Sequence, residues 1–402
     1  MSDPSRVRMS GPLTPFATGF DAELARAGYA PFSRAQHLRL AAHLSRWLEG
    51  RGLDSHALTD ALIGQYVQSR RGAGYATRVS AKALAPLMRH LRALGAAPAP
   101  CAPERSGPEE PLLSRYRRCL SEERGLTSET ASIYVDAVRP FLAERPEALA
   151  LERLHAAEVV AFCVERLPRL SKSRAKQTTT ALRSLLGFLH AEGLIAEPLA
   201  AAVPAVSSWR LQGLPKGLEP DQLARLLGSC DQATAVGRRD HAVLTVLARL
   251  GLRAGEVATL RLSDIDWRAG ELRVRGKGRR TDRLPLPADV GEAIARYLRD
   301  GRPPGIEEQA VFVRALAPHR GLSASGVSSV VARGARRVGL GRVGAHRLRH
   351  TAATELLRAG AALPEVGQLL RHRRAETTAI YAKADREALR TIARRWPAGG
   401  AK

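Results

Sequence analysis

The chain has 402 residues, of which 63 are Lys or Arg and 39 are Asp or Glu, so its formal net charge is +24 and its pI is near 11.1. Hydrophobic residues make up 45% of the chain, which excludes a globally disordered protein, and the length predicts two or three domains. Such a positive excess favours a polyanionic partner, with nucleic acid ahead of an anionic membrane. A genome rich in Arg codons would explain the ratio of Arg to Lys but not the excess itself.

The start of the chain and its cysteines indicate a cytoplasmic protein. Residues 1–20 contain no apolar segment of a signal peptide, and no run approaches the roughly 18 apolar residues that a membrane span needs. The four cysteines include no C-x-x-C pair, which favours reduced thiols over a disulfide framework or a zinc ribbon. We therefore expect a nucleic-acid partner and no membrane partner.

Two proline-rich segments divide the chain into three blocks. Proline lacks the N–H that helices and inner strands need, so residues 98–111 and 201–215 are predicted to be linkers. The blocks that they separate are residues 1–97, 112–200 and 216–402. The first two blocks show only helical patterns.

These two helical blocks resemble each other. The segment ALAPLMRHLRALG (83–95) matches ALRSLLGFLHAEG (181–193) at an offset of 98 residues, with apolar residues at i, i+3, i+4 and i+7. The matched positions are Leu84, Leu87, Met88 and Leu91 in the first segment and Leu182, Leu185, Leu186 and Leu189 in the second. The match indicates either a duplicated bundle of about four helices or the chance alignment of two amphipathic helices.

A basic segment, SKSRAKQTTTALRSLL, leads into the last helix of the second block. It carries Lys172, Arg174 and Lys176, followed by Thr178. Basic and hydroxyl side chains at a helix N-terminus suit contact with DNA phosphates. A solvated basic turn explains the same pattern equally well.

The third block mixes helical and strand patterns. Between helical segments, DIDWRAGELRVRGKGRRTDRLPLP (264–287) alternates polar and apolar residues and turns at a glycine-rich, basic point. This pattern predicts a hairpin of two or three strands on a helical domain. The expected fold class is therefore mainly α, with a small β-hairpin or sheet in an α+β third domain.

Several basic residues of this block lie at predicted helix ends or on a turn, and a tyrosine follows them. Arg253 lies between a glycine that ends one predicted helix and the start of the next, where free backbone N–H groups can hold an anion. Lys277 lies on the GKG turn, which is narrow enough to enter a groove. His372 ends the segment QLLRH, and Tyr381 follows nine residues later. Tyr381 could be an ordinary core tyrosine, but its spacing from His372 and the threonine pair before it favour a nucleophile.

His346 and His350 lie four residues apart in GAHRLRHTAATELL, a spacing that raises the question of a zinc site. Zinc-binding histidine pairs usually have a carboxylate nearby, whereas here Arg347 and Arg349 lie between them. We therefore expect no metal. Arginine and histidine together suit a phosphodiester instead, because a guanidinium holds two phosphate oxygens and stabilises the charge that grows in the transition state.

Together these motifs resemble the catalytic domain of the tyrosine site-specific recombinases, the phage integrase family. The resemblance rests on four segments in the usual order: LGLRAGEVATLRLSDID, RVRGKGRRTDRLPLP, HRLRHTAATELL and LLRHRRAETTAIYAK. It implies a tyrosine recombinase catalytic domain over residues 216–402 and a helical, SAM-like core-binding domain over residues 112–200. Residues 1–97 would be a further helical domain, either a duplicate of the core-binding domain or an arm-like addition.

The resemblance implies an enzyme that cuts and rejoins DNA at specific sites through a 3′-phosphotyrosine, without metal or ATP. Tyr381 would be the nucleophile, and Arg253 and Arg349 would hold the non-bridging phosphate oxygens. Lys277 would protonate the leaving 5′-oxygen. The sequence contains no G-x-x-x-x-G-K-[ST] phosphate loop, so no nucleotide or other cofactor is expected.

The remaining residues receive supporting assignments from the same resemblance. His346 would accept the tyrosine proton or bond the phosphate, and His372 would support the same phosphate. Glu256 would orient the first arginine through a carboxylate pair, and His350 would have a structural or supporting role. Many family members have LGH where this chain has LRH, so Arg371 replaces a glycine and is expected to contact DNA.

The expected partner is double-stranded DNA, bound by a homotetramer or by an assembly with sister recombinases. An apolar stripe near the C-terminus is expected to dock on a neighbouring protomer; it comprises Leu389, Ile392, Ala393 and Trp396. One alternative is a monomeric DNA-relaxing enzyme like the type IB topoisomerases. Another is a non-catalytic DNA-binding regulator, which would have lost catalytic positions. The sequence leaves open the target site and whether the role is phage, transposon, integron or chromosomal.

Overall fold

A computed structural model describes residues 3–100, 107–144, 151–206, 217–276, 281–372 and 375–384. The chain divides into two compact units, Met1–Pro100 together with Gly213–Lys402, and Cys101–Gln212. Both limits of the second unit fall within the segments predicted as linkers. Lys277 and the C-terminal apolar stripe lie outside the described residues.

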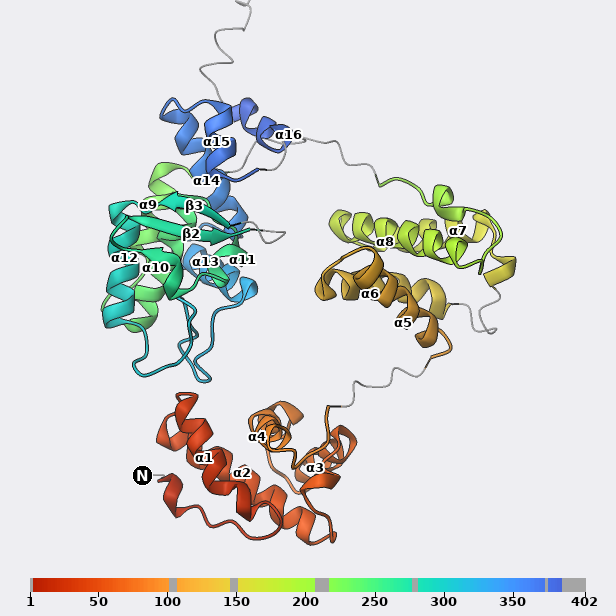
Figure 1. The fold of residues 1–402 in the computed structure, drawn as a ribbon, viewed down its shortest axis with the longest axis vertical. Coiled ribbons are helices and arrows are strands. Elements are labelled where there is room, and N and C mark those ends of the chain that lie inside the picture. The colour runs from red at the N-terminus through yellow and green to blue at the C-terminus, as the bar shows by residue number, and fades with distance from the viewer. Residues whose placement is uncertain are drawn as a thin grey trace, which may run out of the picture. The chain divides into compact units, whose positions relative to one another are not determined.

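The first block forms a helical bundle with its own core. Its helices are α1 (Ala17–Arg26), α2 (Pro31–Glu49), α3 (Asp60–Gly72) and α4 (Ala81–Ala93) (Figure 1). Thr59 caps α3 by accepting the backbone N–H of Leu62, a donor that would otherwise have no partner inside the helix. The predicted apolar stripe of α4 is buried in the core of this bundle, as the i, i+3, i+4, i+7 pattern requires.

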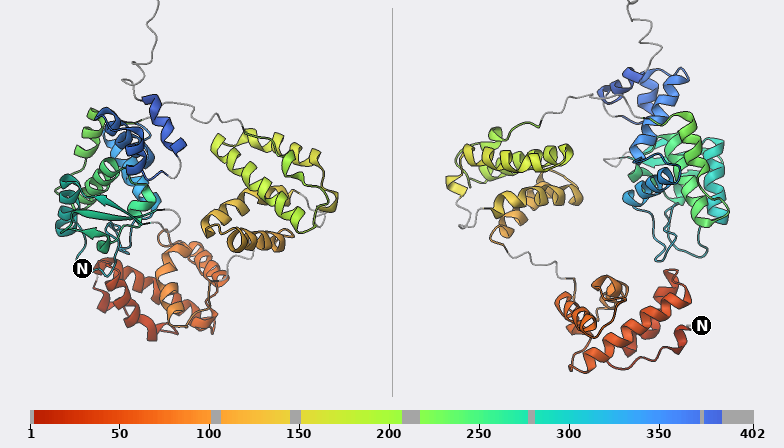
Figure 2. Two further views of the ribbon diagram at one scale, coloured as in Figure 1. Left: turned by 45° about the horizontal axis from the view of Figure 1, so that its top comes forward. Right: turned by 180° about the vertical axis from the view of Figure 1, so that it is seen from behind.

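The second block forms another helical bundle around a separate core. Its helices are α5 (Glu110–Arg118), α6 (Ser128–Ala143), α7 (Ala156–Arg166) and α8 (Lys172–Ala191), seen from two further sides in Figure 2. The stripe of α8 is fully buried. At the offset of 98 residues, α8 begins opposite position 74, whereas α4 begins only at Ala81. The stripes therefore correspond, but the basic first turns of α8 have no helical counterpart in the first block.

A three-stranded antiparallel sheet lies within the third block. It consists of β1 (Ile265–Asp266), β2 (Glu271–Arg275) and β3 (Thr281–Pro285), in the order β1-β2-β3. Alternate residues of β2 are buried, among them Leu272 and Val274. The predicted hairpin on a mainly helical fold is therefore confirmed.

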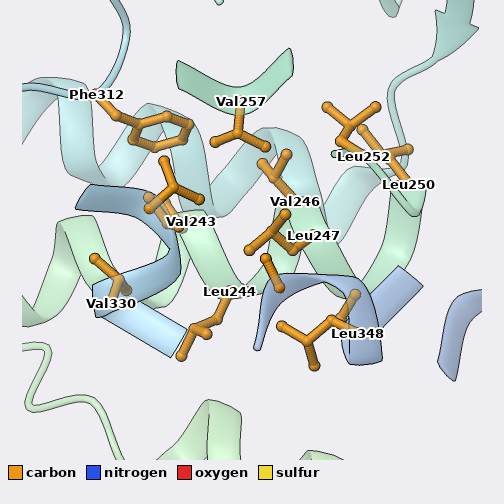
Figure 3. Close-up of a cluster of buried hydrophobic side chains, with 14 of the residues drawn as sticks. Val243, Leu244, Val246, Leu247, Leu250, Leu252, Val257, Phe312, Val330 and Leu348 are labelled. Carbon is orange, nitrogen blue, oxygen red and sulfur yellow. The ribbon is translucent and has the colours of Figure 1, made fainter. Parts of the chain in front are cut away.

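Helix α10 (Ala235–Leu250) is the centre of the third block. Its apolar side chains pack against Val257, Phe312, Val330 and Leu348, which come from different segments of the block (Figure 3). The surrounding helices are α9 (Pro220–Gly228), α11 (Ala254–Ala258), α12 (Ala288–Asp300), α13 (Ala324–Arg337) and α14 (Ala345–Arg358). A helix that is buried on most sides gives the segments at its C-terminal end a fixed position, and Arg253 lies there.

The C-terminal elements form a small separate cluster on α14. They are α15 (Leu363–Leu369), α16 (Ala375–Thr378) and the 3-10 helix η9 (Ala379–Ala384). Ala353, Val366, Leu370 and Tyr381 are the buried members of this cluster. Across the described ranges, no helix combines the length and the apolar character needed to cross a membrane.

Candidate active site

Arg253 lies at the N-terminus of α11, directly after the turn that ends α10. Gly251 makes this turn with a φ of 56°, in the left-handed region that glycine adopts without steric cost. The buried carboxylate of Glu256 accepts the Arg253 backbone N–H at 2.8 Å and its Nη1 at 2.7 Å. The Arg253 side chain is still 47% exposed, so donors remain available to a ligand.

Glu256 stays ionised although it is buried. Burial raises its pKa, but the Arg253 backbone N–H and the charge of Arg371 outweigh that effect and leave the pKa below its usual value. A permanent negative charge here orients Arg253, as the one-turn spacing in the sequence suggested.

Arg349 is the most deeply buried of the charged groups in the site, at 1% exposure. On α14, it donates from Nη1 to the carbonyl oxygen of Gly251 at 2.6 Å and from Nη2 to the carbonyl oxygen of Leu370. Burial, with the charge of Arg253, lowers the pKa of Arg349 to about 10, so it remains protonated at neutral pH. Arg349 thus joins the turn after α10 to the end of α15, and its guanidinium has a fixed orientation.

The hydroxyl of Tyr381 is held by His350. Tyr381 lies in η9, is 2% exposed, and its Oη is 2.8 Å from Nδ1 of His350. Burial raises the pKa of Tyr381, although the charge of Arg349 acts in the opposite direction. The sequence had assigned the proton-accepting role to His346, but its ring contacts that of His350, at a centroid distance of 4.5 Å.

His350 is neutral at pH 7. Burial, followed by the charges of His346 and Arg349, lowers its pKa to about 4. A neutral ring can accept the tyrosine hydroxyl at Nδ1 while it carries its proton at Nε2. His350 therefore contacts the candidate nucleophile directly, whereas the sequence predicted a structural or supporting role for it.

His372 contacts the side chains of both Tyr381 and Thr378. Its Nδ1 is 2.9 Å from Oγ1 of Thr378, and its ring is stacked at 12° to that of Tyr381 with a centroid distance of 6.4 Å. Burial, together with the charge of Arg349, lowers the pKa of His372 to about 4. The buried hydroxyl of Thr378 was not assigned a role from sequence, although its place six residues after His372 was visible.

Two residues expected to contact DNA are turned inward instead. Thr178 on α8 is only 6% exposed, because its position on the helix faces the core of the second block. The side chain of Arg371 is 8% exposed and is paired with Glu256 at 2.7 Å. Lys172, Arg174 and Lys176 are exposed on α8, as a phosphate-contacting set would require.

The described part of this site is rich in cations and nitrogen donors. Among the described residues, no group of three or more His, Cys, Asp or Glu side chains could hold a metal ion. The buried carboxylate of Glu256 is already shared between Arg253 and Arg371. Two guanidinium groups near a phenol and two neutral histidines suit an anion that reacts with the phenol, such as a phosphodiester.

Comparison with known proteins agrees with this chemistry. The model of the phage integrase family matches residues 216–388. The integrase/recombinase y4rA of Sinorhizobium fredii (strain NBRC 101917 / NGR234) is 41% identical over 96% of this chain and 95% of its own length. Tyrosine recombinase XerC of Anoxybacillus flavithermus (strain DSM 21510 / WK1) is 30% identical over 70% of this chain and 95% of its own.

Two solved structures show the same fold. One is the XerH site-specific recombinase bound to a palindromic difH substrate in a post-cleavage complex, with a TM-score of 0.56, 20% identity, and coverage of 82% of this chain and 93% of that chain. The other is a lambda integrase dimer bound to a COC′ core site, with a TM-score of 0.54, 18% identity, and coverage of 80% and 89%. The family predicted from the motifs is confirmed: this chain belongs to the phage integrase family and is a tyrosine recombinase.

Proposed function

We propose that this enzyme breaks and rejoins DNA through a covalent bond between Tyr381 and a 3′-phosphate. The observation that supports this most directly is the 2.8 Å contact between the Tyr381 hydroxyl and a neutral His350, in a site that also contains Arg349. Attack by the tyrosine oxygen forms the P–O bond to the enzyme and breaks the bond between phosphorus and the 5′-oxygen. Because one phosphoester replaces another, rejoining needs no ATP.

The roles of the other side chains follow from their positions. Arg349, with its orientation fixed by two carbonyls, and the more exposed Arg253 would hold the non-bridging oxygens of the phosphate. His350 would orient the tyrosine hydroxyl by accepting its hydrogen bond at Nδ1. The exposed His346 keeps its proposed contact with the phosphate. Lys277, outside the described residues, is proposed to protonate the leaving 5′-oxygen.

We further propose that the protein acts in the cytoplasm on two DNA duplexes held by four copies of the chain, alone or with sister recombinases. Its relatives support this arrangement: a lambda integrase tetramer has been solved bound to a Holliday junction, with a TM-score of 0.54 and 19% identity to this chain. Exposed Lys172, Arg174 and Lys176 on α8 are proposed to contact phosphates in each complex. The C-terminal apolar stripe is proposed to dock on a neighbouring protomer.

A plasmid assay distinguishes strand exchange from simple relaxation. Nicked duplexes tiled across the DNA that flanks the gene first identify the site, because cleavage beside a nick traps the covalent adduct. A supercoiled plasmid with two such sites should then be resolved into two circles in EDTA, while a plasmid without sites stays supercoiled. Relaxation of the site-free plasmid without any circle exchange would contradict the proposal.

The leaving-group role of Lys277 has its own test. Lys277→Ala should slow cleavage strongly, because the 5′-oxygen then leaves without a proton. A substrate with a 5′-bridging sulfur should restore the rate, since a thiolate leaves without protonation. If the sulfur substrate is cleaved as slowly as the oxygen substrate, Lys277 does not act as the general acid.

A further inference from the structure

The turn that presents His372 has an unusual residue at its centre. After α15, the N–H of Arg371 bonds to the carbonyl of Gln368 at 2.9 Å, and the N–H of His372 bonds to that of Gly367 at 3.0 Å. This pair of bonds forms a Schellman motif, whose left-handed position is usually a glycine. Arg371 occupies that position with a φ of 52°. The same turn therefore determines the backbone of Arg371 and that of His372.

The Arg371 side chain returns into the site instead of pointing to solvent. Its Nη2 donates to Oε2 of Glu256 at 2.7 Å, and its Nη1 donates to the carbonyl of Leu369 at 3.1 Å. Its Nε lies 3.9 Å from Oδ2 of Asp282 on β3. A side chain with 8% exposure and these partners has little surface left for a DNA phosphate.

Glu256 is the point at which two parts of the site meet. One of its oxygens accepts Nη1 of Arg253, and the other accepts both the Arg253 backbone N–H and the Arg371 guanidinium. The carboxylate therefore connects the start of α11 to the turn after α15. Asp282 adds a weaker connection to β3, the strand that begins four residues after Lys277 in the sequence.

We propose that Arg371 is a positioning residue that fixes the His372 turn against Arg253 through their shared partner Glu256. This inference rests on the proposed function, because it concerns the alignment of two groups that would hold one phosphate. Arg371 itself touches neither DNA nor the reacting atoms. The positive φ of Arg371 is unfavourable. It is maintained because the guanidinium donates hydrogen bonds to Glu256 on one side and to the carbonyl of Leu369 in the turn on the other.

Replacement by glycine separates the side chain from the backbone turn. Arg371→Gly introduces a residue that adopts a φ of 52° without steric cost, and Arg371→Asn provides a second variant that tolerates this region. On a nicked substrate at saturating DNA, we expect both to form the Tyr381 adduct about ten-fold more slowly. The DNA concentration for half-saturation and its salt dependence should stay unchanged, and Arg371→Lys should recover part of the rate.

A double-mutant cycle with Glu256→Gln tests the shared carboxylate. We expect Glu256→Gln to be slower than Arg371→Gly, because it also removes the support of Arg253, and the double variant to be no slower than Glu256→Gln. Arg299→Ala is the matched control, since Arg299 is exposed on α12 and pairs only with its neighbour Asp300 among the contacts that the structure describes. A native rate in Arg371→Gly, or additive effects in the cycle, would overturn the inference.

Two outcomes separate this inference from its alternatives. If Arg371→Gly instead weakens DNA binding and lowers the salt slope by about 1, Arg371 is a phosphate contact and not a positioning residue. If the native protein forms no Tyr381 adduct on any of the nicked duplexes tiled across the flanking DNA, the proposed function fails. The inference is then tested by the ¹⁵N signal of His372 in the free protein, which Arg371→Gly and Glu256→Gln should shift and Arg299→Ala should not; an unmoved signal overturns it.

Discussion

The two arginines of the site are held in different ways. Arg253 is 47% exposed and is oriented by a carboxylate three residues along the chain, whereas Arg349 is 1% exposed and donates to main-chain carbonyls 98 and 21 residues away. The first is a local arrangement that a short motif can encode. The second depends on the packing of α14 against α10 and α15. Losing Arg253 should therefore affect chemistry alone, while losing Arg349 should affect both chemistry and folding.

The largest effect is expected for Arg349→Ala. It removes a phosphate-holding donor, which should slow adduct formation at least about 100-fold, as for a lost oxyanion donor. It also leaves two buried carbonyls without a partner, at a cost of roughly 1–3 kcal/mol each. Single-turnover cleavage and urea unfolding measure the two effects. Full recovery of the cleavage rate and of the free energy of unfolding by Arg349→Lys would show that donation to the carbonyls of Gly251 and Leu370 is unimportant.

Arg253→Ala should have a comparable effect on the rate, about 100-fold, but little effect on stability. Glu256 keeps Arg371 as an ionic partner, so its buried charge is not left alone. We expect the free energy of unfolding to fall by less than about 1 kcal/mol. The double variant Arg253→Ala/Arg371→Gly should lose far more, because it leaves the carboxylate buried and unpaired. Equal stability of the single and double variants would contradict this account.

The histidines of the site predict how stability depends on pH. The pKa values of His350 and His372 are about 4 in the folded state and about 6.5 in the unfolded chain, so the unfolded chain binds more protons between these values. The free energy of unfolding should be at its full value above pH 6.5 and should fall as the pH decreases toward 4. Urea unfolding at several pH values measures this slope.

Histidine variants identify the source of that slope. His350→Gln and His372→Gln should each flatten it and also slow cleavage. His37→Gln is the control in the first block, where burial also lowers the pKa to about 4. It should flatten the slope and leave the cleavage rate unchanged. An unaltered slope in all three variants would show that these rings are not held neutral.

The smallest effect is expected at Gly251, whose carbonyl accepts from Arg349. A side chain at its φ of 56° is strained, and an added Cβ would lie 2.8 Å from Cδ2 of Leu370. We expect Gly251→Ala to cost roughly 1–2 kcal/mol of stability and to slow cleavage only a few-fold. Gly255→Ala on α11 is the matched control, because no atom beyond its chain neighbours and the backbone of its own helix lies within 4 Å of its Cβ position, and it should be neutral or slightly stabilising.

Features with a short repeat or motif were predictable from the sequence. The apolar stripes of α4 and α8, the strand pattern of β2 and the pairing of Arg253 with Glu256 all involve residues within one or two turns. Contacts between distant segments were not predictable in this way. The inward turn of Arg371 depends on a carboxylate 115 residues away, and the contact of Tyr381 with His350 spans 31 residues.

Thr178 shows that a pattern visible in the sequence can still be interpreted wrongly. Its hydroxyl and its basic neighbours suggested a phosphate contact, but a threonine on a helix serves as well in the core when its face is turned inward. Thr178 lies four residues before Leu182 and seven before Leu185, so it shares the buried face of α8 with the apolar stripe.

The central claim is that Tyr381 carries the covalent bond to DNA. The most direct measurement is the protein–DNA adduct that forms on a nicked target duplex in EDTA, resolved under denaturing conditions and mapped by mass spectrometry. We predict that the native enzyme gives an adduct on the peptide containing Tyr381, joined to the 3′-phosphate, and that Tyr381→Phe binds the same DNA with equal affinity but gives none. An adduct of undiminished yield in Tyr381→Phe would contradict the account.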